Sequence, residues 1–177
     1  WFALAMLVII LATFFIVFGV SKQAINKALE DTLVNTVVFN LREVEYHNDI
    51  TEANLLAADE YVLYGNGFLE IDEDFLNASN GTFTSLYDSE KNMIYGENPI
   101  AKQSFVVNLS DDTLQEIYVN KVKYFIYDKE IETGDQSLRL RGVVPETEGS
   151  SQLNTIATWS LIILPLLWLL AVVGGYV

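Results

Sequence analysis

The hydrophobic positions divide the chain into two uncharged ends and a charged middle. Residues 1–20 and 149–177 carry no charged side chain, so all 24 acidic and 10 basic residues lie between them. About twenty helical residues span the roughly 30 Å hydrocarbon core of a bilayer. We therefore predict two transmembrane helices, residues 1–20 and 156–177, with Trp159 and Tyr176 where interfacial aromatic residues are enriched.

Two alternatives exist for these ends. A buried core helix rarely runs for twenty residues without a charge. A cleaved signal peptide has an apolar run of about 7–15 residues and a small-x-small cleavage motif, and residues 1–20 have a longer run with no such motif after it. An uncleaved anchor is therefore predicted. Because the chain lacks an initiator methionine and stops at the end of the second span, we interpret it as a fragment of a longer protein.

Residues 21–153 are long enough to form one domain with its own core. The first apolar helix is predicted to continue past the membrane, because neither Gly nor Pro occurs from Val20 to His47. Asp49 or Thr51 is expected to begin a second helix. Apolar residues of the long helix recur every three or four positions, which is typical of one helical face: Ile25, Leu29, Leu33, Val37, Leu41 and Val44.

The rest of the middle region shows strand signals. Residues 82–87 and 92–95 flank the polar turn DSEK, and residues 121–132 and 137–145 flank the turn GDQ, as in two β-hairpins. Between them, Ser110 is expected to cap a short helix through DDTLQEIYV. This order of helices and hairpins predicts an α+β domain with an antiparallel sheet and helices on one side.

Charge and residue usage narrow the chemistry. A formal net charge of −14 argues against nucleic acid or anionic lipid as a binding partner of the middle domain, because both repel a negative surface. The chain has one histidine and no cysteine, so it lacks the residues that common nucleophile–base pairs and His-rich metal sites require. We therefore predict no catalytic residue and no metal site. His47 is expected to be a helix-end residue, and the acidic runs IDED and SDD are expected to be solvated turns.

The strands nevertheless contain candidates for binding a small anionic ligand or a peptide. Tyrosine hydroxyls and arginine guanidinium groups on one sheet face could hold such a ligand. Ordinary half-buried sheet positions are the alternative for each of them. The candidates are Tyr87, Tyr95, Tyr124, Tyr127, Arg139 and Arg141.

The predicted membrane helices contain small residues and a proline that suggest helix packing and signal transmission. Small residues let a second helix approach closely, and a proline removes a backbone donor and bends a helix. Chance spacing and a static proline are the alternatives. A homodimer contact is predicted at Ala5, Ala12 and Gly19, and a transmission element at Pro165, Ala171 and Gly175.

The chain resembles the input half of bacterial membrane sensor histidine kinases, in particular those of Gram-positive gut anaerobes. The stretch YDSEKNMIYGENP resembles the hairpin of extracytoplasmic PAS-like sensor domains. The stretches KYFIYDKEIE and LRLRGVVP, followed by LPLLWLLAVVGGYV, resemble the sheet and second span that precede the kinase part in this family. The resemblance covers nearly the whole chain, and it rests on segment lengths and turn residues.

The resemblance implies that residues 21–153 form a PAS-like sensor domain outside the plasma membrane of a bacterial cell. The expected function is the sensing module of a two-component system that binds an unknown extracellular ligand. A cytoplasmic kinase beyond these residues would use ATP and phosphorylate a response regulator, whereas no cofactor is expected here. Besides the homodimer, the expected partner of the two spans is membrane lipid. The alternatives are the sensor of a chemoreceptor or cyclase, or a membrane-anchored assembly or binding protein.

Overall fold

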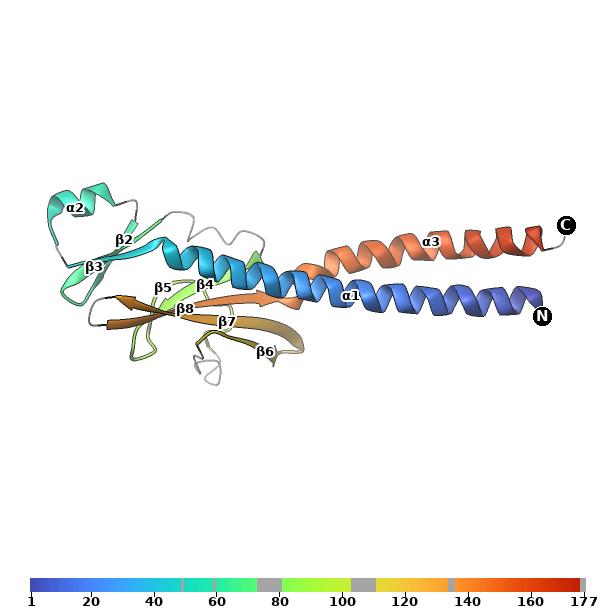
Figure 1. Ribbon diagram of the computed structural model, residues 1–177, viewed down its shortest axis with the longest axis horizontal. Helices are drawn as coiled ribbons and strands as arrows, with labels where there is room; N and C mark the ends of the chain where they lie inside the picture. Colours follow the sequence, from blue (N-terminus) through green and yellow to red (C-terminus); the bar gives the residue numbers. More distant parts are fainter. Residues whose placement is uncertain (49, 59, 73–80, 103–110, 134–135, 176–177) are drawn as a thin grey trace. The chain divides into compact units, whose positions relative to one another are not determined.

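A computed structural model describes all residues except 49, 59, 73–80, 103–110, 134–135 and 176–177 (Figure 1). The chain divides into two compact units. One unit consists of residues 29–148, and the other consists of Trp1–Ala28 together with Gly149–Val177. Helix α1 (Phe2–Arg42) contributes to both units as one uninterrupted helix of 41 residues.

The long helix was predicted, but its end was placed too far along the chain. It ends at Arg42, and the next residues form strand β1 (Val44–His47). In the sequence VEYH, Val44 is buried and Tyr46 packs against the core, while Glu45 is exposed. This alternation fits a strand pairing better than one more helical turn, so His47 lies on a strand and not at a helix end.

The larger sheet has five antiparallel strands in the order β5-β4-β8-β7-β6. The two predicted hairpins are confirmed as β4–β5 and β7–β8, and the last strand of the chain lies at the centre of the sheet. The strands are β4 (Phe83–Tyr87), β5 (Met93–Gly96), β6 (Thr113–Val119), β7 (Val122–Thr133) and β8 (Gln136–Pro145).

The short helix predicted after Ser110 is wrong for the described residues. Ser110 itself lies outside them, and Thr113–Val119 form the edge strand β6. A tight turn joins β6 to β7, with positive φ angles at both Asn120 and Lys121, as the right-handed strand twist favours in two-residue hairpins. Pairing with β7 therefore overrides the local helix signal.

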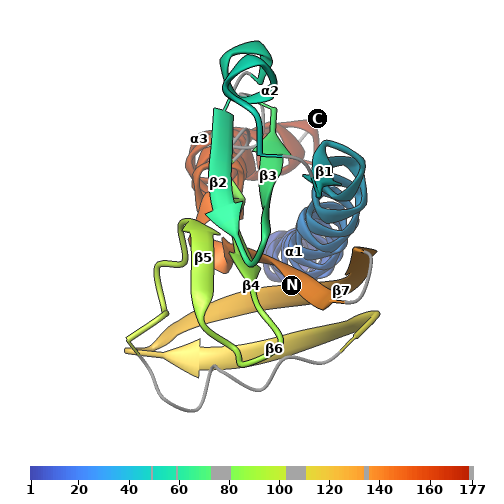
Figure 2. The same ribbon diagram turned by 90° about the vertical axis from the view of Figure 1, so that its left-hand side faces the viewer.

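A second, smaller sheet was not predicted. It has three antiparallel strands, and β3 (Gly67–Ile71) lies between β1 and β2 (Glu60–Tyr64) (Figure 2). Helix α2 (Glu52–Ala57) lies between β1 and β2 in the sequence. The predicted start of this helix is confirmed at Thr51, whose hydroxyl accepts a hydrogen bond from the Asn54 amide at 3.2 Å. Asp49 lies outside the described residues.

One hydrophobic core joins α1 to both sheets. Leu33 and Val37 of α1 are fully buried, and they pack with Leu86, Phe125 and further core residues of both sheets. The helix lies so close to β8 that a Cβ atom at Gly142 would stand 2.4 Å from Cγ2 of Val37 and 2.7 Å from Cδ1 of Leu33. Glycine at this position therefore sets how closely α1 packs on the sheet. The α+β class predicted from the sequence is confirmed.

In the other unit, two helices are long and apolar enough to cross a membrane. The second is α3 (Ser150–Gly174), preceded by the 3-10 turn η4 (Glu146–Gly149). Trp168 donates from its indole nitrogen to the carbonyl oxygen of Ala3 at 3.2 Å. Partly buried residues recur every three or four positions on both helices, which indicates that the two pack along these stripes: Met6, Ile10, Phe14 and Phe18 on α1, and Leu153, Ile156, Ser160, Leu164 and Trp168 on α3.

We predict that Gly142→Ala lowers the free energy of unfolding by about 1–3 kcal/mol, because the new methyl group forces α1 away from β8. Val37→Ala makes room for that methyl group. In the Val37→Ala background, Gly142→Ala should therefore lower the free energy of unfolding by a smaller amount. Urea unfolding of the whole chain in detergent, followed by circular dichroism, measures both effects. An equal loss in the two backgrounds would contradict close packing at this point.

Candidate ligand-binding site

Four of the six predicted ligand residues lie on the side of the larger sheet that faces away from α1, which we call the outer face. Strand register places Ser85 opposite Arg141 and Tyr87 opposite Arg139. Tyr124 lies on the same face of β7 as Asp128, the partner of Arg141. The other two candidates, Tyr95 and Tyr127, lie on the side of α1 and pack into the main core.

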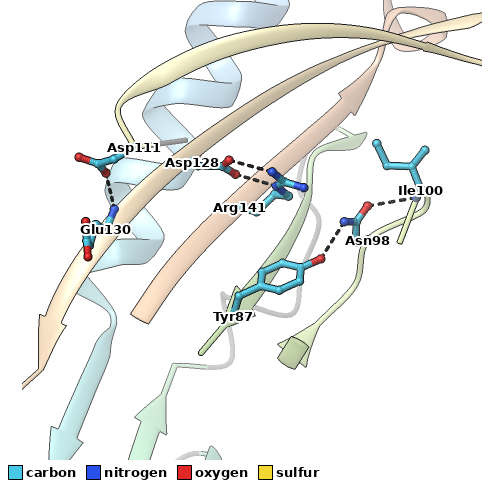
Figure 3. A network of polar contacts seen from close by, with 7 residues as sticks. All are labelled: Tyr87, Asn98, Ile100, Asp111, Asp128, Glu130 and Arg141. Carbon is cyan, nitrogen blue, oxygen red and sulfur yellow. Dashed lines mark hydrogen bonds and ion pairs between the residues drawn. The ribbon is translucent and has the colours of Figure 1, made fainter. Parts of the chain in front are cut away.

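Arg141 and Asp128 form a fully buried ion pair at the centre of the outer face. They stand opposite each other on β8 and β7, with side-chain exposures of 1% and 0%. Nε and Nη2 of Arg141 donate to the two carboxylate oxygens at 2.7 and 2.8 Å (Figure 3). Such a two-point pair neutralises both charges and fixes their orientation. Arg141 is therefore a residue that organises the sheet, and its depth keeps it from a ligand in solvent.

A short segment after β5 is held onto this face by Tyr87. The guanidinium carbon of Arg141 lies 5.9 Å from the centre of the Tyr87 ring. The side-chain amide of Asn98 donates to the Tyr87 hydroxyl at 2.9 Å, and the backbone amide of Ile100 donates to Oδ1 of Asn98 at 3.0 Å (Figure 3). Ile100 is buried and packs in a second apolar cluster with Val119, Ile126 and Val143. Tyr87 and Arg141 thus position the segment after β5 on the outer face.

Arg139 is partly exposed and lies at a pocket. Its Nη2 lies 3.2 Å from Oε2 of Glu130, and the Ser137 hydroxyl donates to the same carboxylate. Its Nη1 has no hydrogen-bond partner among the described residues. A pocket at this position is lined by Asp88, Ser89, Lys91, Glu130, Ser137 and Arg139.

The pocket contains two cationic and two anionic side chains beside serine hydroxyls. The positive charges of Arg139 and Lys91 at the pocket suit a carboxylate or phosphate group of a ligand. Glu130 is held in place by its own backbone amide, which donates to Oδ1 of Asp111 at 2.7 Å (Figure 3). Only Arg139 among the predicted ligand residues lines this pocket, and Lys91 was not predicted, since its position depends on the β4–β5 turn.

Tyr127 is occupied by a different interaction. Its hydroxyl donates to Oδ1 of Asp112, which also lies 3.2 Å from Nζ of Lys129. Burial and the Asp112 carboxylate raise the pKa of Tyr127 to about 12. The hydrogen bond from Tyr127, and then Lys129, lower the pKa of Asp112. Tyr127 therefore ties β7 to the start of β6.

Tyr95 is likewise held on the α1 side of the sheet. Burial, and after it the nearby Glu60 carboxylate, raises the pKa of the Tyr95 phenol. Tyr95 of β5 in the larger sheet thus lies near Glu60 of β2 in the smaller one. The position of Tyr95 indicates a role in joining the two sheets.

The residues predicted for dimer contact and transmission lie on the two apolar helices. Ala5, Ala12 and Gly19 are exposed, and a Cβ atom at Gly19 would meet nothing within 4 Å. Pro165 lies inside α3 and is exposed. A Cβ atom at Gly175 would stand 2.4 Å from Cε1 of Phe2, close to the partly buried Ala171, which marks a close approach of the two helices.

One cluster of polar side chains was missed altogether. Glu45 and His47 of β1 and Glu70 of β3 converge on one face of the smaller sheet. Glu70 is 23 residues from His47, and its strand was not predicted. The alternating sequences VEYH and GFLEI are the local signal that could have found these strands.

Comparison of the chain with protein-family models, with curated proteins and with solved structures finds no match.

We predict that Tyr127→Phe raises the pKa of Asp112 towards its ordinary value, because the variant loses the hydroxyl that stabilises the ionised carboxyl group. A lowered folded-state pKa stabilises the fold above the unfolded-state pKa, and this stabilisation is lost as pH falls through the folded value. The stability difference between wild type and variant should therefore shrink on acidification. NMR titration of the side-chain carboxyl carbon measures the pKa directly.

Tyr118→Phe is the matched control, because Tyr118 is 70% exposed and lies on the edge strand β6, which follows Asp112. This control should leave the Asp112 titration unchanged. An Asp112 pKa that is the same in wild type and Tyr127→Phe would show that the hydroxyl does not stabilise the carboxylate.

Proposed function

We propose that this chain is the sensing module of a two-component sensor histidine kinase in a bacterial plasma membrane. The observation that carries the proposal is the continuity of α1, which runs from an uncharged apolar stretch into the core of the folded unit without a break. A continuous helix with one end in each environment can pass a shift of the sheet on to the apolar segment.

The larger sheet supports a PAS-like sensor domain as the input part. It has five antiparallel strands with the last strand at its centre, and α1 packs against one face through Leu33 and Val37. The opposite, outer face contains the pocket at Arg139 and Lys91. A small ligand with an anionic group suits this pocket, and the fixed pair Arg141–Asp128 would carry a shift from the pocket rim into the sheet.

The proposed topology places residues 21–153 outside the cell and both apolar helices in lipid. The charge distribution supports it, because all charged residues fall between Lys22 and Glu148. Large apolar side chains along both helices are exposed, including Phe15 at 68% and Leu161 at 77%. Lipid removes the cost of hydrating these side chains.

We infer that a homodimer forms through the face of α1 that does not pack against α3. Ala5, Ala12 and Gly19 are exposed, whereas the stripe of Ile10 and Phe14 is partly buried. Small residues on an open face allow a second copy to pack closely in a membrane. The alternatives, a chemoreceptor, a cyclase or an assembly protein, share this architecture. An Arg-rich linker and a His-Glu-Pro-like helix after Val177 would favour the kinase, and a long heptad hairpin would favour a chemoreceptor.

We predict that Gly175→Leu changes signal output, because its side chain would occupy the place of the Phe2 ring where α1 and α3 approach closely. Gly174→Leu is the matched control, since a Cβ atom there would meet nothing within 4 Å. In the full-length protein, phosphate transferred to the response regulator measures the output, and immunoblotting of membranes controls for abundance. If Gly175→Leu and Gly174→Leu give equal output at equal abundance, α3 is a passive anchor.

We also predict that single cysteines at Ala5, Ala12 and Gly19 form disulfides between copies in membranes under mild oxidation. Cysteines at Ile10 and Phe14 are the controls, and they should crosslink weakly because these positions face α3 within one chain. The native chain has no cysteine, so each product reports one position. A flat crosslinking profile across the five positions would rule out this dimer contact.

A further inference from the structure

Three side chains with metal-ligating atoms meet on one face of the smaller sheet. Glu45 and His47 are two residues apart on β1, so their side chains point to the same side of the sheet. On the neighbouring strand β3, Glu70 is the residue directly opposite Glu45. Nε2 of His47 lies 2.9 Å from Oε2 of Glu70 and 3.8 Å from Oε2 of Glu45. One ligand atom from each residue lies within 4.8 Å of the other two.

These distances suit a tetrahedral metal ion. Zinc binds imidazole nitrogen and carboxylate oxygen at about 2.0–2.2 Å, and a tetrahedral angle then separates two ligand atoms by roughly 3.3–3.5 Å. The two observed distances from Nε2, 2.9 and 3.8 Å, lie on either side of this value. Small side-chain rotations would bring all three atoms into coordination and leave a fourth position for water.

The hydrogen on Nε2 of His47 can bridge to one of the two carboxylates. Nε2 of His47 can carry one hydrogen and donate it to one carboxylate, which in this geometry is Glu70. The Glu45 carboxylate, 3.8 Å away, is too far to accept a hydrogen bond from the same nitrogen. A divalent cation in place of the proton would bind the imidazole and both carboxylates, and its charge would balance theirs.

The imidazole is already oriented for such a role. Its ring stacks on Phe68 at 4.9 Å with an interplanar angle of 19°, and Phe68 is only 1% exposed. The side chains of His47, Glu45 and Glu70 are 36%, 71% and 39% exposed, so an ion can reach them from solvent. A pocket beside them is lined by both glutamates together with Arg42, Glu43, Ile71 and Asp72, and its excess of acidic groups attracts cations.

We propose that Glu45, His47 and Glu70 bind a divalent transition-metal ion of the zinc class. An imidazole with two carboxylates suits zinc, nickel or copper, whereas magnesium and calcium prefer oxygen ligands alone. The bound ion would tie β1 to β3 at the point where the chain leaves α1 after Arg42. The site does not depend on the proposed sensor function, because binding can be measured without any signal output.

The test is calorimetric titration of the whole chain in detergent with zinc chloride. One equivalent should bind, and the affinity should fall roughly tenfold or more in His47→Ala and in Glu45→Gln, since even the loss of a group behind a ligand costs about tenfold. Glu97→Gln, an exposed glutamate beyond β5, is the matched control and should bind as wild type does. Magnesium chloride should give no comparable binding.

Cobalt(II) provides a second readout. Its visible absorption should show tetrahedral coordination in wild type, and this signature should be lost in His47→Ala. Glu45→Gln keeps the test valid if His47→Ala unfolds, because Glu45 is largely exposed; circular dichroism checks the fold of each variant. Absence of zinc binding by wild type, or equal binding by wild type, His47→Ala and Glu45→Gln, would overturn the site.

Discussion

The exclusion of uncharged helical surface from water is the constraint on which the rest of this structure depends. The first twenty residues of the chain carry no charge, and large side chains such as Phe15 are exposed along the helix they form. Burying apolar surface is worth about 25 cal/mol per Å², so such a helix must find lipid or a partner. In α1 only the N-terminal part has this exposed apolar surface, because the C-terminal part packs in the core of the folded unit.

That other end closes the core of the folded unit. Leu33 and Val37 are fully buried and lie directly over Gly142 of the central strand β8. On the opposite side of the same strand, Arg141 and Asp128 form their buried pair. Buried pairs often add little net stability, but removing one partner leaves an uncompensated charge, so this pair restricts how β7 and β8 can move relative to each other. Strand β8 is therefore restrained on both faces.

Local signals explain how much of this could be predicted from the sequence. The hairpins β4–β5 and β7–β8 follow from polar turns between alternating strands, and the long helix follows from its periodicity. Strand β6 was mistaken for a helix because Ser110 and two aspartates resemble a cap, and only pairing with β7 decides the conformation. The hairpin β2–β3 was not predicted, although Gly65 and Gly67 lie at its turn.

The site chemistry was less predictable, because it depends on strand register. The sequence suggested six ligand residues, yet register places Tyr95 and Tyr127 towards α1 and buries Arg141 against Asp128, which leaves Arg139 at a pocket. The convergence of Glu45, His47 and Glu70 likewise requires β1 to pair with β3. No residue spacing along the chain contains that information.

The proposed topology places both apolar helices in the membrane and residues 21–153 outside the cell. The most direct measurement is labelling of single cysteines in intact cells with a membrane-impermeant maleimide, since the chain has no native cysteine. Ser89→Cys, in the exposed turn between β4 and β5, should be labelled in intact cells. Leu7→Cys, within the first apolar stretch, should react only after the membrane is dissolved. Labelling of Ser89→Cys only after the cells are lysed would contradict the account.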